Sequence, residues 1–151
     1  MQKIIIADTS CLILISKIGA FEILQRLFSE VVVTSVIAEE FGEPLPSFFK
    51  LKDAQNKNYQ NILQTSVDKG EASAIALAVE QDECLLILDD QKARTLASEL
   101  KLKHTGTLGI LVDAKLSGYI PSVKPLLDKI RETNFRLSPE LESKILNRAG
   151  E

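Results

Sequence analysis

Acidic side chains stand at or just beyond the ends of three apolar runs in this 151-residue sequence. The runs are short and rich in Ile, Val and Leu, as is typical of buried strands, and they cover 3–7, 31–34 and 84–88. Acids directly follow the first and third runs. A further pair lies about one helical turn beyond the second run, and another acid begins the helix that leads into the third. The candidates are Asp8, Glu39, Glu40, Glu71, Asp89 and Asp90.

Several carboxylates in one pocket repel each other, and each loses part of its hydration, so they stay ionised at neutral pH only beside a cation. The sequence has one histidine, His104, and its two cysteines, Cys11 and Cys84, lie far apart. An oxygen-only set of ligands suits Mg²⁺ or Mn²⁺ rather than Zn²⁺. Such ions bind phosphate groups, activate water and stabilise a leaving oxygen. The acids therefore indicate metal-assisted hydrolysis of phosphodiester bonds.

Each acid also has a purely structural interpretation. Asp8 and the Asp89-Asp90 pair are placed to cap the helices that follow them. Asp68 and Glu71 have the D-x-x-E spacing of a capping box, which by itself explains both residues. At least one member of the Glu39–Glu40 pair is expected to be solvated. The argument for a site therefore depends on the coincidence of several placements.

Hydroxyl and basic side chains complete the set of candidates. The hydroxyls expected near the same edge of the sheet belong to Ser10, Thr105 and Thr107. Lys92 and Arg94 directly follow the Asp89-Asp90 pair, as substrate contacts or as solvated helix charges. His104 is expected to be a partly buried polar residue rather than a metal ligand.

The elements that must position these residues alternate between strand and helix. A short fourth strand is expected at 104–105, and helical patterns cover 11–18, 20–28, 36–41, 68–79, 92–100, 108–116, 124–132 and 138–148. This alternation predicts a single α/β domain over 1–151, with a parallel sheet covered by helices on both faces. Ligands of such sheets bind beyond the carboxyl ends of the strands, where the strand order reverses.

Residues 42–61 are polar and irregular, with two prolines and the pair Phe48-Phe49. This pattern is typical of a long loop or mobile arm. The two phenylalanines could bind a partner or substrate, or they could pack on the domain.

Composition excludes several classes of protein. With 45% hydrophobic and 26% charged residues the chain is neither disordered nor fibrous. Its uncharged runs are too short to span a bilayer, no basic segment of a secretory signal precedes them, and the two separate cysteines favour a reducing, cytoplasmic compartment. The net charge of −3 hides a contrast between −7 over residues 1–90 and +4 over 91–151. This contrast could reflect an acidic pocket beside a basic rim, or it could be an accident of sequence order. A slightly acidic total is compatible with a nucleic-acid partner when a metal ion neutralises some of the acids.

Four segments in order resemble the PIN domain, a metal-dependent ribonuclease family that includes toxins of toxin–antitoxin pairs. They are IIIADTS at 4–10, VIAEEF at 36–41, DKGEASAIALA at 68–78 and LLILDDQKAR at 85–94. Together with HTGTLGILVDAK at 104–115 and IPSVKPLLDKI at 120–130, they are similar to a PIN-like subfamily once catalogued only as a domain of unknown function. The resemblance covers essentially the whole chain, with least support across 42–66. It implies an α/β/α sandwich with a central, mainly parallel sheet of four to five strands.

The resemblance also selects among the candidates. The family's first acid, in a D-[TS]-[SN] pattern, falls on Asp8 with Ser10 as the supporting hydroxyl, and its second, before an apolar residue, falls on Glu40. The third falls on Glu71 of the G-E-A pattern. The fourth usually reads T-x-D and falls on Asp90, with Leu88 in place of the hydroxyl residue, so that Asp89 remains the alternative.

The implied activity is hydrolysis of single-stranded or structured RNA with Mg²⁺ or Mn²⁺. Asp8 and Asp90 would bind the ion directly, Glu40 and Glu71 would complete its shell, and Lys92, Arg94 and Lys103 would hold the RNA backbone. An antitoxin protein and a second copy of the chain are further implied partners. Two other functions stay open: a non-catalytic PIN-like binding module, and a metal-dependent phosphatase such as a haloacid-dehalogenase-like enzyme. The phosphatase family needs an aspartate where this chain has Ser10.

Overall fold

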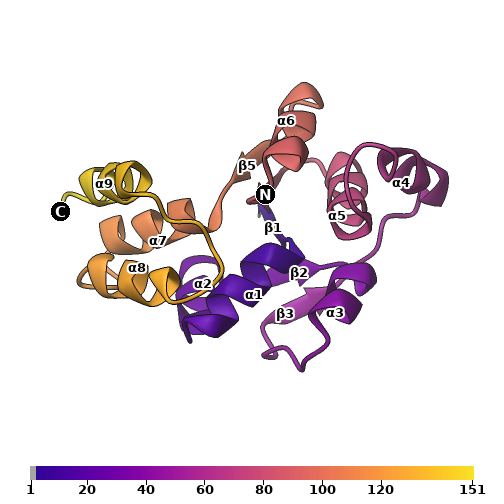
Figure 1. Ribbon diagram of the computed structural model, residues 1–151. Coiled ribbons are helices and arrows are strands. Elements are labelled where there is room, and N and C mark those ends of the chain that lie inside the picture. Colours follow the sequence, from indigo (N-terminus) through magenta and orange to yellow (C-terminus); the bar gives the residue numbers. More distant parts are fainter. Residues whose placement is uncertain (1–2) are drawn as a thin grey trace.

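A parallel sheet forms the centre of the computed structural model, which describes residues 3–151 (Figure 1). Within these residues the sheet has five strands in the order β3-β2-β1-β4-β5, all parallel. The strands are β1 (Ile4–Ala7), β2 (Val31–Val33), β3 (Phe49–Leu51), β4 (Cys84–Ile87) and β5 (Lys103–Thr105). The α/β class and the parallel sheet predicted from the sequence are confirmed.

The two central strands, β1 and β4, define the point where the strand order reverses. The chain moves outward from β1 through β2 to β3, then crosses back to β4 and continues to β5. The register pairs Ile4 with Cys84 and Ala7 with Ile87, so the two strands end side by side. The acids that follow β1 and β4 therefore leave the sheet at the same edge, which is the position where ligands of such sheets bind.

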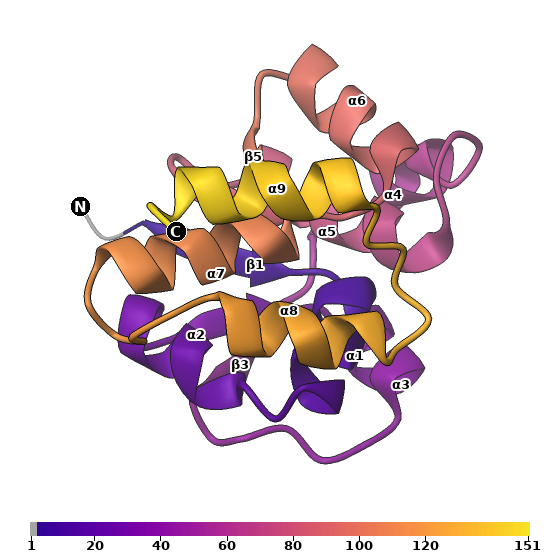
Figure 2. The ribbon, with the colours of Figure 1, turned by 60° about the vertical axis from the view of Figure 1, so that its left-hand side comes forward.

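Helices cover both faces of this sheet. The helices are α1 (Thr9–Lys17), α2 (Phe21–Phe28), α3 (Ser35–Phe41), α4 (Lys57–Leu63), α5 (Lys69–Val79), α6 (Gln91–Glu99), α7 (Thr107–Leu116), α8 (Lys124–Arg131) and α9 (Pro139–Arg148). Figure 1 shows α1, α2, α7, α8 and α9 on one side of the sheet and α4 and α5 on the other. Figure 2 shows that α8 and α9 are the outermost helices on their side.

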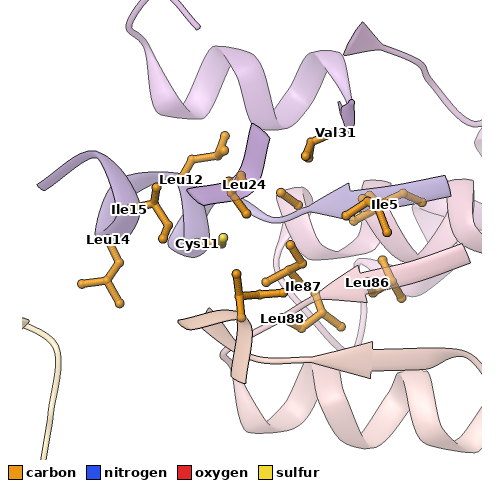
Figure 3. Packing of buried hydrophobic residues seen from close by; sticks show 14 of the residues in the cluster. Ile5, Cys11, Leu12, Leu14, Ile15, Leu24, Val31, Leu86, Ile87 and Leu88 are labelled. Carbon is orange, nitrogen blue, oxygen red and sulfur yellow. The ribbon is translucent and has the colours of Figure 1, made fainter. Parts of the chain in front are cut away.

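The hydrophobic core lies between these layers. Leu12 and Ile15 of α1 and Leu24 of α2 lie near the strand residues Ile87 and Ile5, and all five side chains are buried (Figure 3). The helix α5 is buried along nearly its whole length, from Gly70 to Ala78. Small alanine side chains allow α5 to pack closely, because bulky residues would hold it away from the sheet. This rigid packing fixes the first turn of α5, where Glu71 lies.

The segment 42–61 is not the long irregular loop expected from its polar sequence. It contains the edge strand β3, which pairs with β2, and the first five residues of α4. The ring of Phe48 is buried, and its centroid lies 4.4 Å from that of Phe49, which in turn lies 5.5 Å from that of Phe21. These aromatic contacts attach β3 to the domain, so the two phenylalanines pack on the protein and do not form an exposed docking site.

None of the helices formed by residues 3–151 is both long enough and apolar enough to cross a membrane.

Candidate active site

Asp8 occupies the end of β1 and caps α1. Its Oδ1 accepts a hydrogen bond of 2.7 Å from the backbone N–H of Thr9, and its own N–H donates to the carbonyl of Ile87 in β4. The side chain is only 3% exposed. The pKa of Asp8 is raised to about 7, mainly because the side chain is buried. The hydrogen bond from Thr9 lowers the pKa, and the charges of Asp68, Glu40 and Asp89 raise it. Asp8 therefore caps α1 and also lies among other acids.

Glu40 reaches this edge from the C-terminal end of α3. Its Oε1 accepts a hydrogen bond of 2.7 Å from the hydroxyl of Thr9, the residue next to Asp8. The same oxygen lies against Gly70 in α5, where a Cβ atom would overlap with it. Glycine at position 70 thus leaves room for the carboxylate, which lies between α1 and α5. Glu39 and Glu40 are both exposed, and Glu40 is the member of the pair that bonds to Thr9.

Glu71 forms the capping box expected with Asp68. The N–H of Glu71 donates to Asp68 Oδ1 at 2.9 Å, and the N–H of Asp68 donates to Glu71 Oε1 at 3.3 Å. Glu71 is 5% exposed, and its pKa is raised to about 8. Burial is the largest cause, and the charges of Asp8, Asp68 and Asp90 raise the pKa further. The structural and the functional interpretations of this residue are therefore compatible, because one carboxylate caps the helix and also lies among the other acids.

The two acids that follow β4 have different partners. Both oxygens of Asp89 bind Thr107 at the start of α7, one accepting from the N–H at 2.8 Å and the other from the hydroxyl at 2.6 Å. Asp90 is exposed and caps α6, with Oδ2 accepting from the N–H of Ala93 at 3.0 Å. Asp89 is thus committed to holding α7, whereas the second oxygen of Asp90 has no hydrogen-bond donor among residues 3–151.

The acids from four separate segments therefore influence each other at one edge of the sheet. Within residues 3–151, no lysine or arginine nitrogen lies within 4.0 Å of any carboxylate oxygen of this group. Their donor atoms are all oxygens, which suits Mg²⁺ or Mn²⁺. As they stand, however, no three side chains in the described part of the chain are arranged as a group that could hold a metal ion. Mutual repulsion of uncompensated carboxylates favours such an open arrangement.

The predicted hydroxyls have different positions. Thr107 is fully buried and bonds to Asp89, which makes it a support for that acid. Thr105 ends β5, and its hydroxyl lies where a side chain at Gly109 would otherwise be. Ser10 is exposed in the first turn of α1, and its side chain has no hydrogen-bond partner among the described residues. Thr9, which the sequence did not single out, is the hydroxyl that contacts a candidate acid.

The three predicted basic contacts also differ in position. Arg94 is half-buried beside the start of α7, with Nη1 near Gly106 and Asp89. Lys92 is exposed on the first turn of α6 and lines an open depression with residues 65–67. Lys103 begins β5 and lines a depression with Asp82 and Glu83. It therefore lies at the N-terminal edge of the sheet, and the structure does not bring it to the acids.

Sequence reasoning missed the roles of Thr9 and Gly70 in this site. The signals for them were present in the D-T-S and D-K-G-E segments. A threonine or a glycine beside an acid has many ordinary explanations, however, and only the packing of α3 against α1 and α5 gives these residues a common partner.

The comparisons with known proteins agree with this fold. A family model described as a PIN domain matches residues 4–151, and no curated protein matches the chain. PIN domains have a nuclease-type fold and typically use divalent metal ions. Because the matched region covers nearly the whole sequence, the chain belongs to the PIN domain family.

Proposed function

We propose that the protein is an endoribonuclease that hydrolyses RNA phosphodiester bonds with the help of Mg²⁺ or Mn²⁺. The observation that supports the proposal is the effect of acids from separate segments on one another at the point of strand reversal: burial and neighbouring acids raise the pKa of Asp8 to about 7 and that of Glu71 to about 8. Buried acids that destabilise one another are typical of sites that bind a cation or carry out chemistry.

Asp8 and Asp90 would bind the ion directly, and Glu40 and Glu71 would complete its surroundings. The ion would supply charge for the attacking water and for the leaving oxygen of the phosphodiester. The chain's own residues set the geometry around it. Thr9 holds the Glu40 carboxylate, and Asp89 fixes the start of α7 beside Arg94. The guanidinium of Arg94 would contact an RNA phosphate. We assign the direct role to Asp90 because the oxygens of Asp89 are already used by Thr107.

Binding of Mn²⁺ to the folded protein tests the site without any assumption about RNA. Metal that binds the native state alone stabilises it by about 2.7 kcal/mol at a free concentration of 100 times Kd. We expect millimolar Mn²⁺ to raise the melting temperature of the wild type and of the exposed-site control Asp113→Asn, but not that of Asp8→Asn. The absence of any shift in the wild type would refute the metal site.

RNA cleavage tests the activity itself. The wild type with Mn²⁺ should cut a labelled single-stranded RNA internally, and the cut should be absent in excess chelator and in Asp8→Asn. A protein that binds Mn²⁺ and RNA but never cleaves would instead be the non-catalytic binding module. Cleavage by Asp8→Asn at the wild-type rate would refute the assigned mechanism.

We further propose that the protein acts as the toxin of a toxin–antitoxin pair. Its protein partners would then be an antitoxin and a second copy of the chain. If the enzyme is a toxin, its induced expression should arrest the growth of a host cell, and Asp8→Asn should remove this effect. Unimpaired growth with active enzyme present would rule out the toxin role and leave the ribonuclease activity standing.

A further inference from the structure

An open cavity of about 420 Å³ lies between the junction of β5 with α7 and the C-terminal helix α9. Figure 2 shows α9 lying along α7. The volume falls within the range of about 300–1,000 Å³ that is usual for sites of small ligands. Of the candidate acids, Asp89 lines the cavity, so the cavity adjoins the proposed active site.

Three cationic side chains line this cavity: Arg94 of α6 and Lys144 and Arg148 of α9. None of the three has a carboxylate oxygen within 4.0 Å among residues 3–151. The carboxylate in the lining is that of Asp89, and its hydrogen bonds with Thr107 leave its negative charge in place. Three cations against one carboxylate give the lining a net positive charge, which favours an anionic ligand.

The start of α7 also lines this cavity. Its N-cap is Gly106, and the N–H of Thr107 in its first turn donates to Asp89. Leu108 and Gly109 both line the cavity, and neither backbone N–H has a hydrogen-bond partner within the described part of the chain. Free N–H groups at the positive end of a helix bind anions such as phosphate. A Cβ atom at Gly106 would come within 2.9 Å of Arg94 Nη1, so glycine allows the guanidinium to lie beside these donors.

The lining also has an apolar part, which is made of Phe135, Leu141 and Ile145. A cavity that combines cations with an aromatic ring matches the two parts of a nucleotide, since bases stack on aromatic side chains and phosphates bind to basic ones.

We propose that this cavity binds one nucleotide of the RNA strand next to the bond that is cleaved. Its phosphate lies among Arg94, Lys144, Arg148 and the start of α7, and its sugar and base lie against Phe135. The assignment rests on the proposed ribonuclease function and adds α9 to the substrate site. It also removes the need for Lys103, which lies at the other edge of the sheet.

The test measures RNA binding in a protein that does not cleave. Asp8→Asn serves as the parent, and Lys144→Gln with Arg148→Gln is added to it. Lys17→Gln with Lys129→Gln is the matched control, because these two cations line a different cavity beside α1 and α8. Fluorescence anisotropy with a labelled single-stranded RNA gives Kd at several salt concentrations, and thermal melting checks that each variant is folded.

Removal of the two α9 cations should weaken RNA binding about tenfold at low salt and reduce the slope of log K against log salt by about 1.4, since each contact with a single strand contributes about 0.7. The control should bind like the parent. In NMR spectra of the parent, a short RNA should shift the amide signals of Leu108 and Gly109.

Unchanged Kd in the folded α9 variant, or unshifted signals of Leu108 and Gly109 at saturating RNA, would overturn the cavity assignment while wild-type cleavage still supports the ribonuclease. Polyglutamate that binds as tightly as RNA of equal length would also overturn it, because the cavity would then be a site for acidic proteins. Failure of the wild type to bind or cleave RNA would reject both proposals.

Discussion

The replacement of Asp8 by Asn is expected to stabilise the metal-free protein at alkaline pH. Burial and neighbouring acids raise the pKa of Asp8 from 3.8 to about 7, which means that the folded protein destabilises the ionised form of this side chain. Asparagine has nearly the same shape, carries no charge, and keeps an oxygen that can accept the 2.7 Å hydrogen bond from Thr9. The substitution therefore removes the repulsion and retains the helix cap.

The size and the pH range of the effect follow from the two pKa values. Between about pH 4 and pH 7 the folded protein keeps a proton on Asp8 that the unfolded chain has lost, so wild-type stability falls as the pH rises. Above pH 7 the cost is constant, at about 4 kcal/mol, because each pKa unit corresponds to about 1.4 kcal/mol. For a domain of this size that difference amounts to roughly 10 °C in melting temperature.

The assay is thermal unfolding of both proteins in excess chelator, from pH 4.5 to pH 9. The variant should melt higher at pH 8, and its advantage should shrink towards zero as the pH falls to 4.5. Asp113→Asn, at an exposed position of α7, should show no such pH-dependent difference. If Asp8→Asn is no more stable than the wild type at pH 8, or if its advantage is the same at all pH values, the inference of a destabilised carboxylate is refuted.

Three further substitutions test the surroundings of this acid. Gly70→Ala should leave stability within about 1 kcal/mol of wild type yet reduce RNA cleavage, because the new methyl group displaces the Glu40 carboxylate; unchanged cleavage would mean that the position of this carboxylate is unimportant. Glu40→Gln should lower the rate of RNA cleavage at least about tenfold, because loss of a group beside a bound metal ion has an effect of this size. Glu39→Gln is the control and should cleave like the wild type. Equal cleavage rates for the two variants would contradict the assignment of Glu40. Thr107→Val should destabilise the protein by about 1–3 kcal/mol in denaturant unfolding, because it removes the hydroxyl donor from Asp89; wild-type stability would show that α7 does not depend on this contact.

The regular part of the fold was predictable because its signals are local. The runs that form β1, β2 and β4 are β-branched or aliphatic and end in residues that cap helices, as Asp8, Thr34 and Asp90 do. Strand β3 was missed because it has only three residues, and helix α4 because its sequence is mostly polar. The strand is stabilised by its pairing with β2 and by the ring of Phe21, which is distant in the sequence, and the helix packs against α5.

The sequence by itself determined the chemistry available, which is a set of carboxylates placed at the ends of parallel strands. It also determined that they leave the sheet at one edge, since parallel strands have their carboxyl ends together. Only the tertiary structure decided which groups meet there. Burial of Asp8 and the negative charges of Asp68 and Glu40 raise its pKa. Thr9 rather than Ser10 contacts Glu40. Helix α9 brings Lys144 and Arg148 to a cavity beside Asp89. These outcomes depend on packing between segments far apart in the chain, and no local pattern records them.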